Sequence, residues 1–166
     1  MKNFIVYFFL YISFCTLQFF FGKYFNAFGF FPNFILILIV YLGLTRGIVH
    51  AEIIGFLFGI TWDIFSTDVF GIRAVMFTTI GYLTGMINKA VDKDSIFAQF
   101  IIMLFANIVY WFGFSVIYWI FPSGEISHSA FITLQSVFKI LSTALFAPLV
   151  FFILDHLNFF ANREST

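Results

Sequence analysis

The sequence predicts an all-α polytopic membrane protein with about six transmembrane helices. Of its 166 residues, 62% are hydrophobic and only 10% are charged, whereas water-soluble domains carry about 25% charged residues. A soluble core for a chain of this length could not enclose so much apolar surface, so the excess should face lipid. Because only short polar turns separate the apolar runs, we expect one transmembrane domain over residues 1–166.

The first two apolar runs predict helices over residues 3–22 and 29–45. The first run is longer than the apolar part of a signal peptide, and no small-residue cleavage site follows it, which favours a retained helix. Pro32 suits the first turn of the second helix, where the missing N–H would have no partner anyway. The aliphatic part of this second run is short. It crosses the bilayer only where the bilayer thins locally, and a re-entrant helix is the alternative.

The next two runs predict helices over residues 49–66 and 71–91, which a polar elbow joins. In each helix the small and polar positions recur at helical spacing, so they share one face. Small residues let the backbones of neighbouring helices approach closely in lipid. We expect these faces to contact protein, either each other or a partner's single membrane helix. They contain Gly55, Gly59 and Asp63 in the first helix, and Gly81 and Gly85 in the second.

The last two runs predict helices over residues 96–120 and 130–157. Tyrosine and tryptophan residues gather toward the end of the first of these, as they do at the membrane–water boundary. The second contains Lys139, whose long stem can reach the interface. It also contains Pro148, at which we expect a kink.

Asp63 and Arg73 are the charged residues that the pattern singles out. A carboxylate in hydrocarbon costs several kcal/mol, so it must pair, protonate or reach the interface. Pairing of the two residues across the elbow would pin the helix hairpin, and exchanging their charges should then preserve part of the stability. The alternative is that Asp63 faces a partner or a substrate. The candidate packing or partner interface therefore consists of Gly55, Gly59, Asp63, Gly71, Arg73, Gly81 and Gly85.

The distribution of lysine and arginine predicts that both termini lie in the cytoplasm. Basic residues are enriched on the cytoplasmic side of inner-membrane proteins. With six spans and an inside N-terminus, the inner side collects more of them than the outer side. The inner set is Lys2, Arg46, Lys89, Lys93 and Arg163, and the outer set is Lys23 and Arg73.

The sequence contains no motif for catalysis or for binding a metal or cofactor. We find no P-loop, no dinucleotide-binding glycine motif, no zinc-protease motif and no nucleophile elbow. The single Cys15 excludes an internal disulfide. The histidines are too far apart in sequence to suggest a shared metal ion. The formal net charge of zero argues against nucleic acid as a partner. We therefore expect a protein that is not an enzyme and needs no cofactor.

The central stretch resembles the MreD family, the small membrane subunit of the bacterial rod-shape machinery. The resemblance covers roughly residues 30 to 95 and rests on the runs Gly55-Phe56-x-x-Gly59-x-x-x-Asp63-x-x-Ser66, Gly71-x-x-Ala74 and Gly81-Tyr82. It implies a non-enzymatic scaffold in the inner membrane that binds an MreC-like protein with one membrane helix. The implied assembly also contains MreB and RodA with its transpeptidase, and it directs lateral peptidoglycan synthesis and cell shape.

The same resemblance supplies an alternative function. The MreD family is similar in fold to the substrate-binding S components of energy-coupling-factor transporters, which implies a small-molecule-binding transport subunit as the second possibility. An S component should have a polar pocket on the outer side, to which several outer loops contribute. Here the outer loops are few and short, which favours the scaffold.

Overall fold

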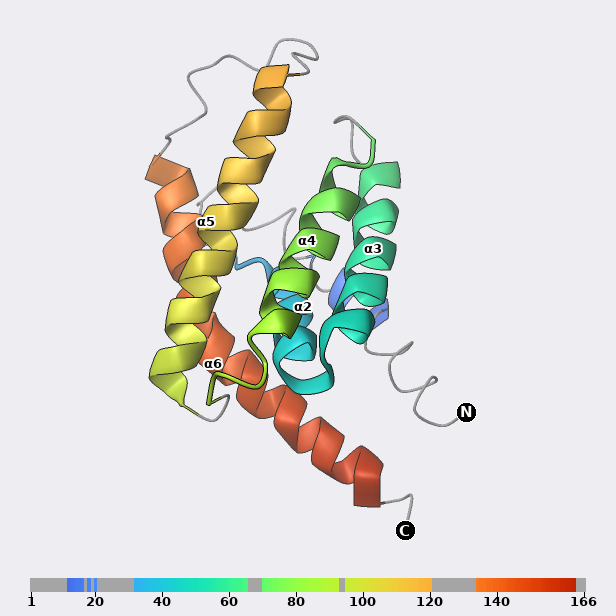
Figure 1. Ribbon diagram of the computed structural model, residues 1–166, viewed down its shortest axis with the longest axis vertical. Helices are drawn as coiled ribbons and strands as arrows, with labels where there is room; N and C mark the ends of the chain where they lie inside the picture. Colours follow the sequence, from blue (N-terminus) through green and yellow to red (C-terminus); the bar gives the residue numbers. More distant parts are fainter. Residues whose placement is uncertain are drawn as a thin grey trace.

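The computed structural model describes residues 12–16, 18, 20, 32–65, 70–92, 95–120 and 134–163 (Figure 1). These residues are mostly helical and contain no β-strand. Residues 12–16 are helical and belong to the predicted first helix, most of which lies outside the described residues. Five longer helices follow: α2 (Phe34–Arg46), α3 (Ile48–Ile64), α4 (Ile72–Met86), α5 (Ile96–Ile120) and α6 (Leu134–Arg163).

The central helix of the bundle is α2. Every residue from Ile35 to Leu44 is buried, and α3, α4, α5 and α6 all pack against it. A helix that is apolar on all sides is expected to be enclosed by other helices. We call the end of the bundle at which α3 ends and α4 begins the elbow end. α5 also ends at the elbow end, and α6 begins at it (top of Figure 1).

Polar groups from three segments hold the start of α2. Asn33 Oδ1 accepts a hydrogen bond of 3.2 Å from the backbone N–H of Leu36, as an N-cap residue does. The backbone N–H of Asn33 donates to Thr143 Oγ1 of α6 at 3.1 Å. The backbone N–H of Phe34 donates to Gln18 Oε1 at 3.0 Å. Because these side chains are buried, the start of α2 is satisfied by protein and not by water.

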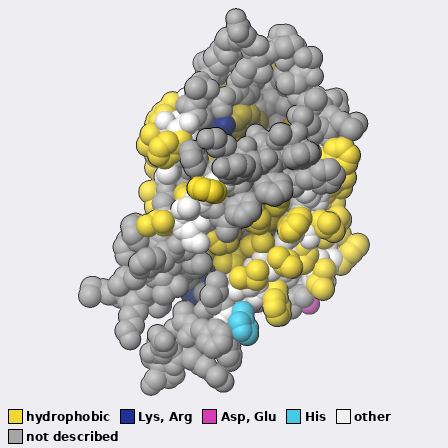
Figure 2. Space-filling view, turned by 180° about the vertical axis from the view of Figure 1, so that it is seen from behind, with side chains coloured by type: hydrophobic (Ala, Val, Ile, Leu, Met, Phe, Trp, Pro, Cys, Tyr) yellow, Lys and Arg dark blue, Asp and Glu magenta, His cyan; other side chains and the backbone are white. Residues whose placement is uncertain are grey.

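The outward side of α3 is apolar. Its buried positions include Gly55, Gly59 and Asp63, whereas half or more of the surface of four large apolar residues is exposed. These are Ile53, Phe56, Leu57 and Ile64. Figure 2 shows that apolar side chains also gather on the described part of the surface that is seen from behind.

Three helix boundaries differ by five residues or more from those expected. α2 starts at Phe34 and not at residue 29, because Asn33 is its N-cap. α4 ends at Met86 and not at residue 91, because residues 87–90 form turns. α6 continues to Arg163, beyond the expected end at residue 157. It changes direction along its length in Figure 1 and contains Pro148, whose ring and missing N–H interrupt the helical hydrogen bonds.

Two described helices are long and apolar enough to cross a membrane, within Ile96–Ile117 and Ser136–His156. The helices α2, α3 and α4 contain 13, 17 and 15 residues. At a rise of about 1.5 Å per residue, α2 covers only about 20 Å of a hydrocarbon core about 30 Å thick. The described part of the chain is therefore helical and of membrane type, and the count of six spans stays a prediction.

Candidate functional site

The two glycines of α3 face the backbone of α4 at very short range. A Cβ atom placed on Gly55 would lie 2.7 Å from the carbonyl oxygen of Phe77. A Cβ on Gly59 would lie 2.7 Å from the carbonyl carbon of Arg73 and would also meet the backbone of Ala74. Backbone atoms cannot rotate aside as side chains do, so any larger residue at these positions would force the two helices apart.

The two glycines of α4 make the same kind of contact in return. A Cβ on Gly81 would lie 2.7 Å from the carbonyl oxygen of Ala51, and one on Gly85 would lie 2.6 Å from Cα of Ile48. The small-residue faces of α3 and α4 therefore cover each other. Because both faces are occupied within the chain, a partner helix cannot use them unless the hairpin opens.

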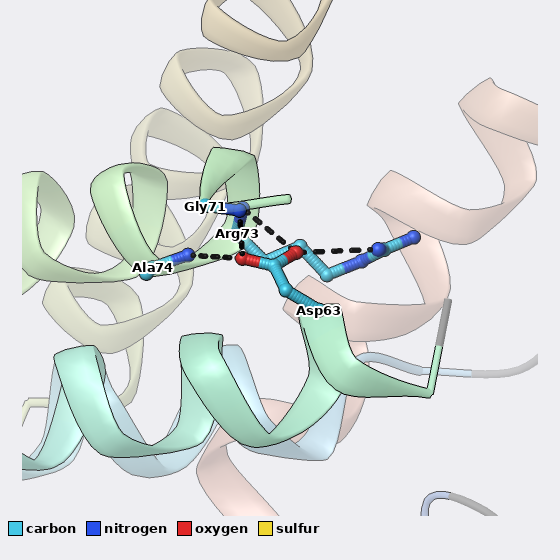
Figure 3. A network of polar contacts seen from close by, with 4 residues as sticks. All are labelled: Asp63, Gly71, Arg73 and Ala74. Carbon is cyan, nitrogen blue, oxygen red and sulfur yellow. Dashed lines mark hydrogen bonds and ion pairs between the residues drawn. The ribbon is translucent and has the colours of Figure 1, made fainter. Parts of the chain in front are cut away.

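Asp63 caps α4 from the neighbouring helix (Figure 3). Its carboxylate accepts hydrogen bonds from the backbone N–H groups of Gly71 at 3.0 Å, Arg73 at 3.3 Å and Ala74 at 3.2 Å. The first of these belongs to the N-cap residue of α4, a glycine whose φ of 94° lies in the left-handed region and which has no side chain to cap the helix. Asp63 supplies the missing acceptor, and its negative charge meets the positive end of the α4 dipole.

Arg73 adds a weaker contact to the same carboxylate. Its Nη1 lies 3.5 Å from Asp63 Oδ1, at the limit of a hydrogen bond. The Asp63 side chain is fully buried, and 14% of the Arg73 side chain is exposed. The guanidinium carbon also lies 5.5 Å from the ring centre of Phe114 on α5, a cation–π distance. Arg73 thereby links α4 to both α3 and α5.

These distances change the interpretation of the ion pair. The sequence predicts a symmetric pair in which the two charges can be exchanged. In the structure, three of the donors described above are backbone groups that stay in place whatever residue 73 is. An arginine at position 63 would face those N–H groups. The charge exchange should therefore fail, for a reason that residue types alone do not reveal.

Several buried polar contacts were not expected from the sequence. The caps of α2 by Gln18, Asn33 and Thr143 are one group. Tyr41 on α2 also donates a hydrogen bond of 2.7 Å to Asp155 on α6. The role of Asn33 could have been predicted from the sequence, since an Asn immediately before an apolar helix is a common N-cap residue. The other partners lie far away along the chain, so only the fold brings them together.

The remaining candidates are placed as follows. Glu52 is partly buried near the start of α3, and Lys139 lies close to the start of α6. Within the described residues, no group of three or more His, Cys, Asp or Glu side chains could hold a metal ion. The arrangement at the elbow end is thus a structural clamp between α3, α4 and α5.

The comparison with known protein families is decisive for identity. The family model of the rod shape-determining protein MreD matches residues 2–159 of the 166-residue chain. The chain belongs to the MreD family. The match extends well beyond the central stretch that carried the resemblance, and it includes the region of α5 and most of α6. No curated protein and no solved structure matches the chain, so the similarity to the S-component fold stays a prediction.

Membership of the MreD family gives this membrane protein a role in determining rod shape. The family is one of structural, shape-determining membrane proteins. The contacts of Asp63 and of the four glycines hold α3 and α4 of this MreD-family protein together as a helix hairpin.

Proposed function

We propose that this MreD-family protein is a non-enzymatic scaffold subunit of the rod-shape complex in the bacterial inner membrane. It binds an MreC-like protein with a single membrane helix and helps to organise lateral peptidoglycan synthesis by the assembly of MreB, RodA and its transpeptidase. Both termini lie in the cytoplasm. The observation that carries the proposal is the family match over residues 2–159.

The packing of α3 against α4 limits the surfaces on which a partner helix can bind. Because Gly55, Gly59, Gly81 and Gly85 are covered within the hairpin, the partner helix must contact outward-facing side chains. Such side chains occur on three separate elements: Phe56 on α3, Phe105 on α5 and Phe152 on α6 are 50%, 60% and 72% exposed. Packing of these apolar faces in lipid comes from shape and dispersion contacts, since no water is released.

The test is co-purification of the protein with the MreC-like protein of the same cell, followed by site-directed crosslinking. Cysteines at positions 56, 105 and 152, each in a Cys15→Ser background, should show one strongly crosslinking face and two weak ones. Depletion should turn rods into spheres. Rod shape that survives complete deletion, or co-purification with a transporter ATPase module in place of the MreC-like protein, would refute the proposal.

A further inference from the structure

The acid Glu52 lies one turn inside α3, at the end of the bundle opposite the elbow end. The residue is half-buried, and within the described part of the chain its carboxylate makes no ion pair and no hydrogen bond. A carboxylate without a partner is strongly disfavoured in hydrocarbon. Glu52 must therefore meet water or lipid headgroups, although it belongs to a helix of membrane type.

Tyr82 of α4 lies at the same level of the hairpin. A Cβ atom on its neighbour Gly81 would be 2.7 Å from the carbonyl oxygen of Ala51 and 3.1 Å from the backbone nitrogen of Glu52. Tyr82 is 43% exposed, and its hydroxyl also makes no hydrogen bond with the residues that the structure describes. Tyrosine favours the membrane–water boundary, where its ring is in apolar surroundings and its hydroxyl is hydrated.

The hydroxyl groups nearer the elbow end are bonded within their own helices. Thr61 Oγ1 donates to the carbonyl oxygen of Leu57, and Thr79 Oγ1 donates to that of Val75, each at 2.8 Å. A hydroxyl in hydrocarbon needs such a partner, because no water is there to supply one. Two polar groups at the level of Glu52 therefore rely on their surroundings, whereas these two threonines do not.

The apolar length that remains on this side of the molecule is short. From Ile53 to Phe65 the chain advances twelve residues, which is about 18 Å along a helix. The hydrocarbon core of a typical bilayer is about 30 Å thick. By contrast, α5 contains 25 residues without a charged side chain, or about 37 Å. A helix that is too long can tilt, whereas one that is too short requires a thinner bilayer.

Two other responses to a short helix are not favoured by the contacts. Arg73, at the elbow end of α4, contacts Asp63 and Phe114 and is not extended along the helix toward the membrane surface. A second helix would need small residues on the outward face, but the glycines are turned inward. Apart from Thr79, the exposed side chains between Glu52 and Tyr82 in the described chain are bulky and apolar: Ile53, Phe56, Leu57, Ile64, Phe65, Phe70 and Val75. This face suits fluid acyl chains.

We propose that lipid headgroups and water reach Glu52 and Tyr82, so that the bilayer is thinner beside the α3–α4 hairpin than beside α5. The membrane surface is indented at the end of the bundle opposite the elbow end. The acyl chains next to the hairpin cover only the part between Glu52 and the elbow. The carboxylate and the tyrosine hydroxyl then find their partners outside the protein.

The experiment measures how fast single cysteines react with a charged, water-soluble maleimide. The full-length protein, purified without a partner, is reconstituted in liposomes of dioleoyl phosphatidylcholine. Freeze–thaw cycles place the reagent on both sides of the membrane, so the orientation of the protein does not affect the result. The test variants are Glu52→Cys and Tyr82→Cys, one on each helix, each in a Cys15→Ser background.

The matched control is Ile101→Cys on α5. Ile101 lies five residues from the start of α5 and is 48% exposed, and Tyr82 lies four residues from the end of α4 at the same end of the bundle. Val75→Cys, nearer the elbow end on the exposed side of α4, serves as the hydrocarbon control. Lys89→Cys, at an exposed position after α4, serves as the water control.

Glu52→Cys and Tyr82→Cys should react within about tenfold of the rate of Lys89→Cys. They should react at least about tenfold faster than Ile101→Cys and Val75→Cys, because hydrocarbon disfavours the thiolate, which is the reactive form. Thermal unfolding in detergent before reconstitution shows whether each variant is folded. If Glu52→Cys is not folded, the rate of Tyr82→Cys decides alone.

Four results would each overturn the proposal. Reaction of Tyr82→Cys as slow as that of Val75→Cys would place Tyr82 in hydrocarbon. Reaction of Ile101→Cys as fast as that of Tyr82→Cys would show a bilayer of equal thickness on both sides. Fast reaction of Val75→Cys would show a water-filled cavity beside α4. A rate for Tyr82→Cys that falls as the protein-to-lipid ratio rises would show that a second copy of the chain covers the hairpin. None of these results depends on the MreC-like protein.

Discussion

Replacing Asp63 by alanine should be the most damaging single change at the elbow end. The substitution removes the acceptor of three backbone N–H groups, of Gly71, Arg73 and Ala74, and of the Arg73 guanidinium. The site is closed to solvent, since the Asp63 side chain has no exposed surface. No water can take the place of the carboxylate without opening the α3–α4 contact.

The expected magnitudes differ between the two members of the pair. Removing one partner of a buried, hydrogen-bonded charge typically costs about 3–5 kcal/mol, which is our expectation for Asp63→Ala. Arg73→Ala leaves the carboxylate with its three backbone donors and removes a contact of 3.5 Å and the cation–π contact with Phe114, so it should cost less, about 1–2 kcal/mol. The exchanged pair, Asp63→Arg with Arg73→Asp, should be no more stable than Asp63→Ala.

The assay is thermal unfolding of the purified protein in detergent, followed by tryptophan fluorescence. At about 2–4 °C per kcal/mol for a chain of this size, Asp63→Ala should lower Tm by about 10 °C and Arg73→Ala by about 4 °C. Asp92→Ala, which removes an exposed acid at the opposite end of α4, is the control and should leave Tm nearly unchanged. Equal losses for Asp63→Ala and Arg73→Ala, or recovery in the exchanged pair, would show that the ion pair and not the helix cap dominates.

Three other outcomes follow from the packing and the topology. Gly59→Leu should separate α3 from α4, lower the amount of folded protein and impair rod shape. Gly113→Ala should destabilise the protein far less, because its Cβ meets only the flexible end of the Met76 side chain. Similar elution profiles of the two variants in fluorescence-detected size-exclusion chromatography would contradict this. Thr143→Val should lower stability by about 1–3 kcal/mol because it leaves the buried backbone N–H of Asn33, the N-cap residue of α2, without its acceptor, and an unchanged Tm would show that another acceptor is available. Cysteines introduced after residues 68 and 125 should react with membrane-impermeant reagents from the periplasm, and labelling from the cytoplasm at either position would refute the six-span topology.

The local sequence pattern was sufficient to predict a helical membrane protein and to predict which side of α3 is buried and which is exposed. Hydropathy and the spacing of glycines are short-range properties, so the buried stripe of Gly55, Gly59 and Asp63 and the exposed side of α3 could be read directly from the order of residues. The family resemblance was likewise carried by this stretch, and the match over residues 2–159 confirms it.

The details that were missed depend on contacts between distant segments. Whether Asp63 binds a side chain or the backbone of α4 depends on how closely α3 and α4 approach each other. The close backbone contacts at Gly55 and Gly59 set that distance, and the sequence alone does not give it. The expected start of α2 at residue 29 was wrong because Asn33 caps the helix with help from Gln18 and Thr143. Nothing in the local sequence announces a partner 110 residues away.

The start of α2 also bears on how the chain is made. The backbone N–H group of its N-cap residue Asn33 donates to Thr143, which the ribosome adds long after α2 itself. A thirteen-residue helix is too short to remain in lipid alone, and unpaired backbone groups there cost several kcal/mol. A nascent or truncated chain without α6 therefore holds α2 as an incomplete intermediate. We therefore expect the packing of α6 to complete the start of α2, so a chain truncated before α6 should keep an unsatisfied polar group there.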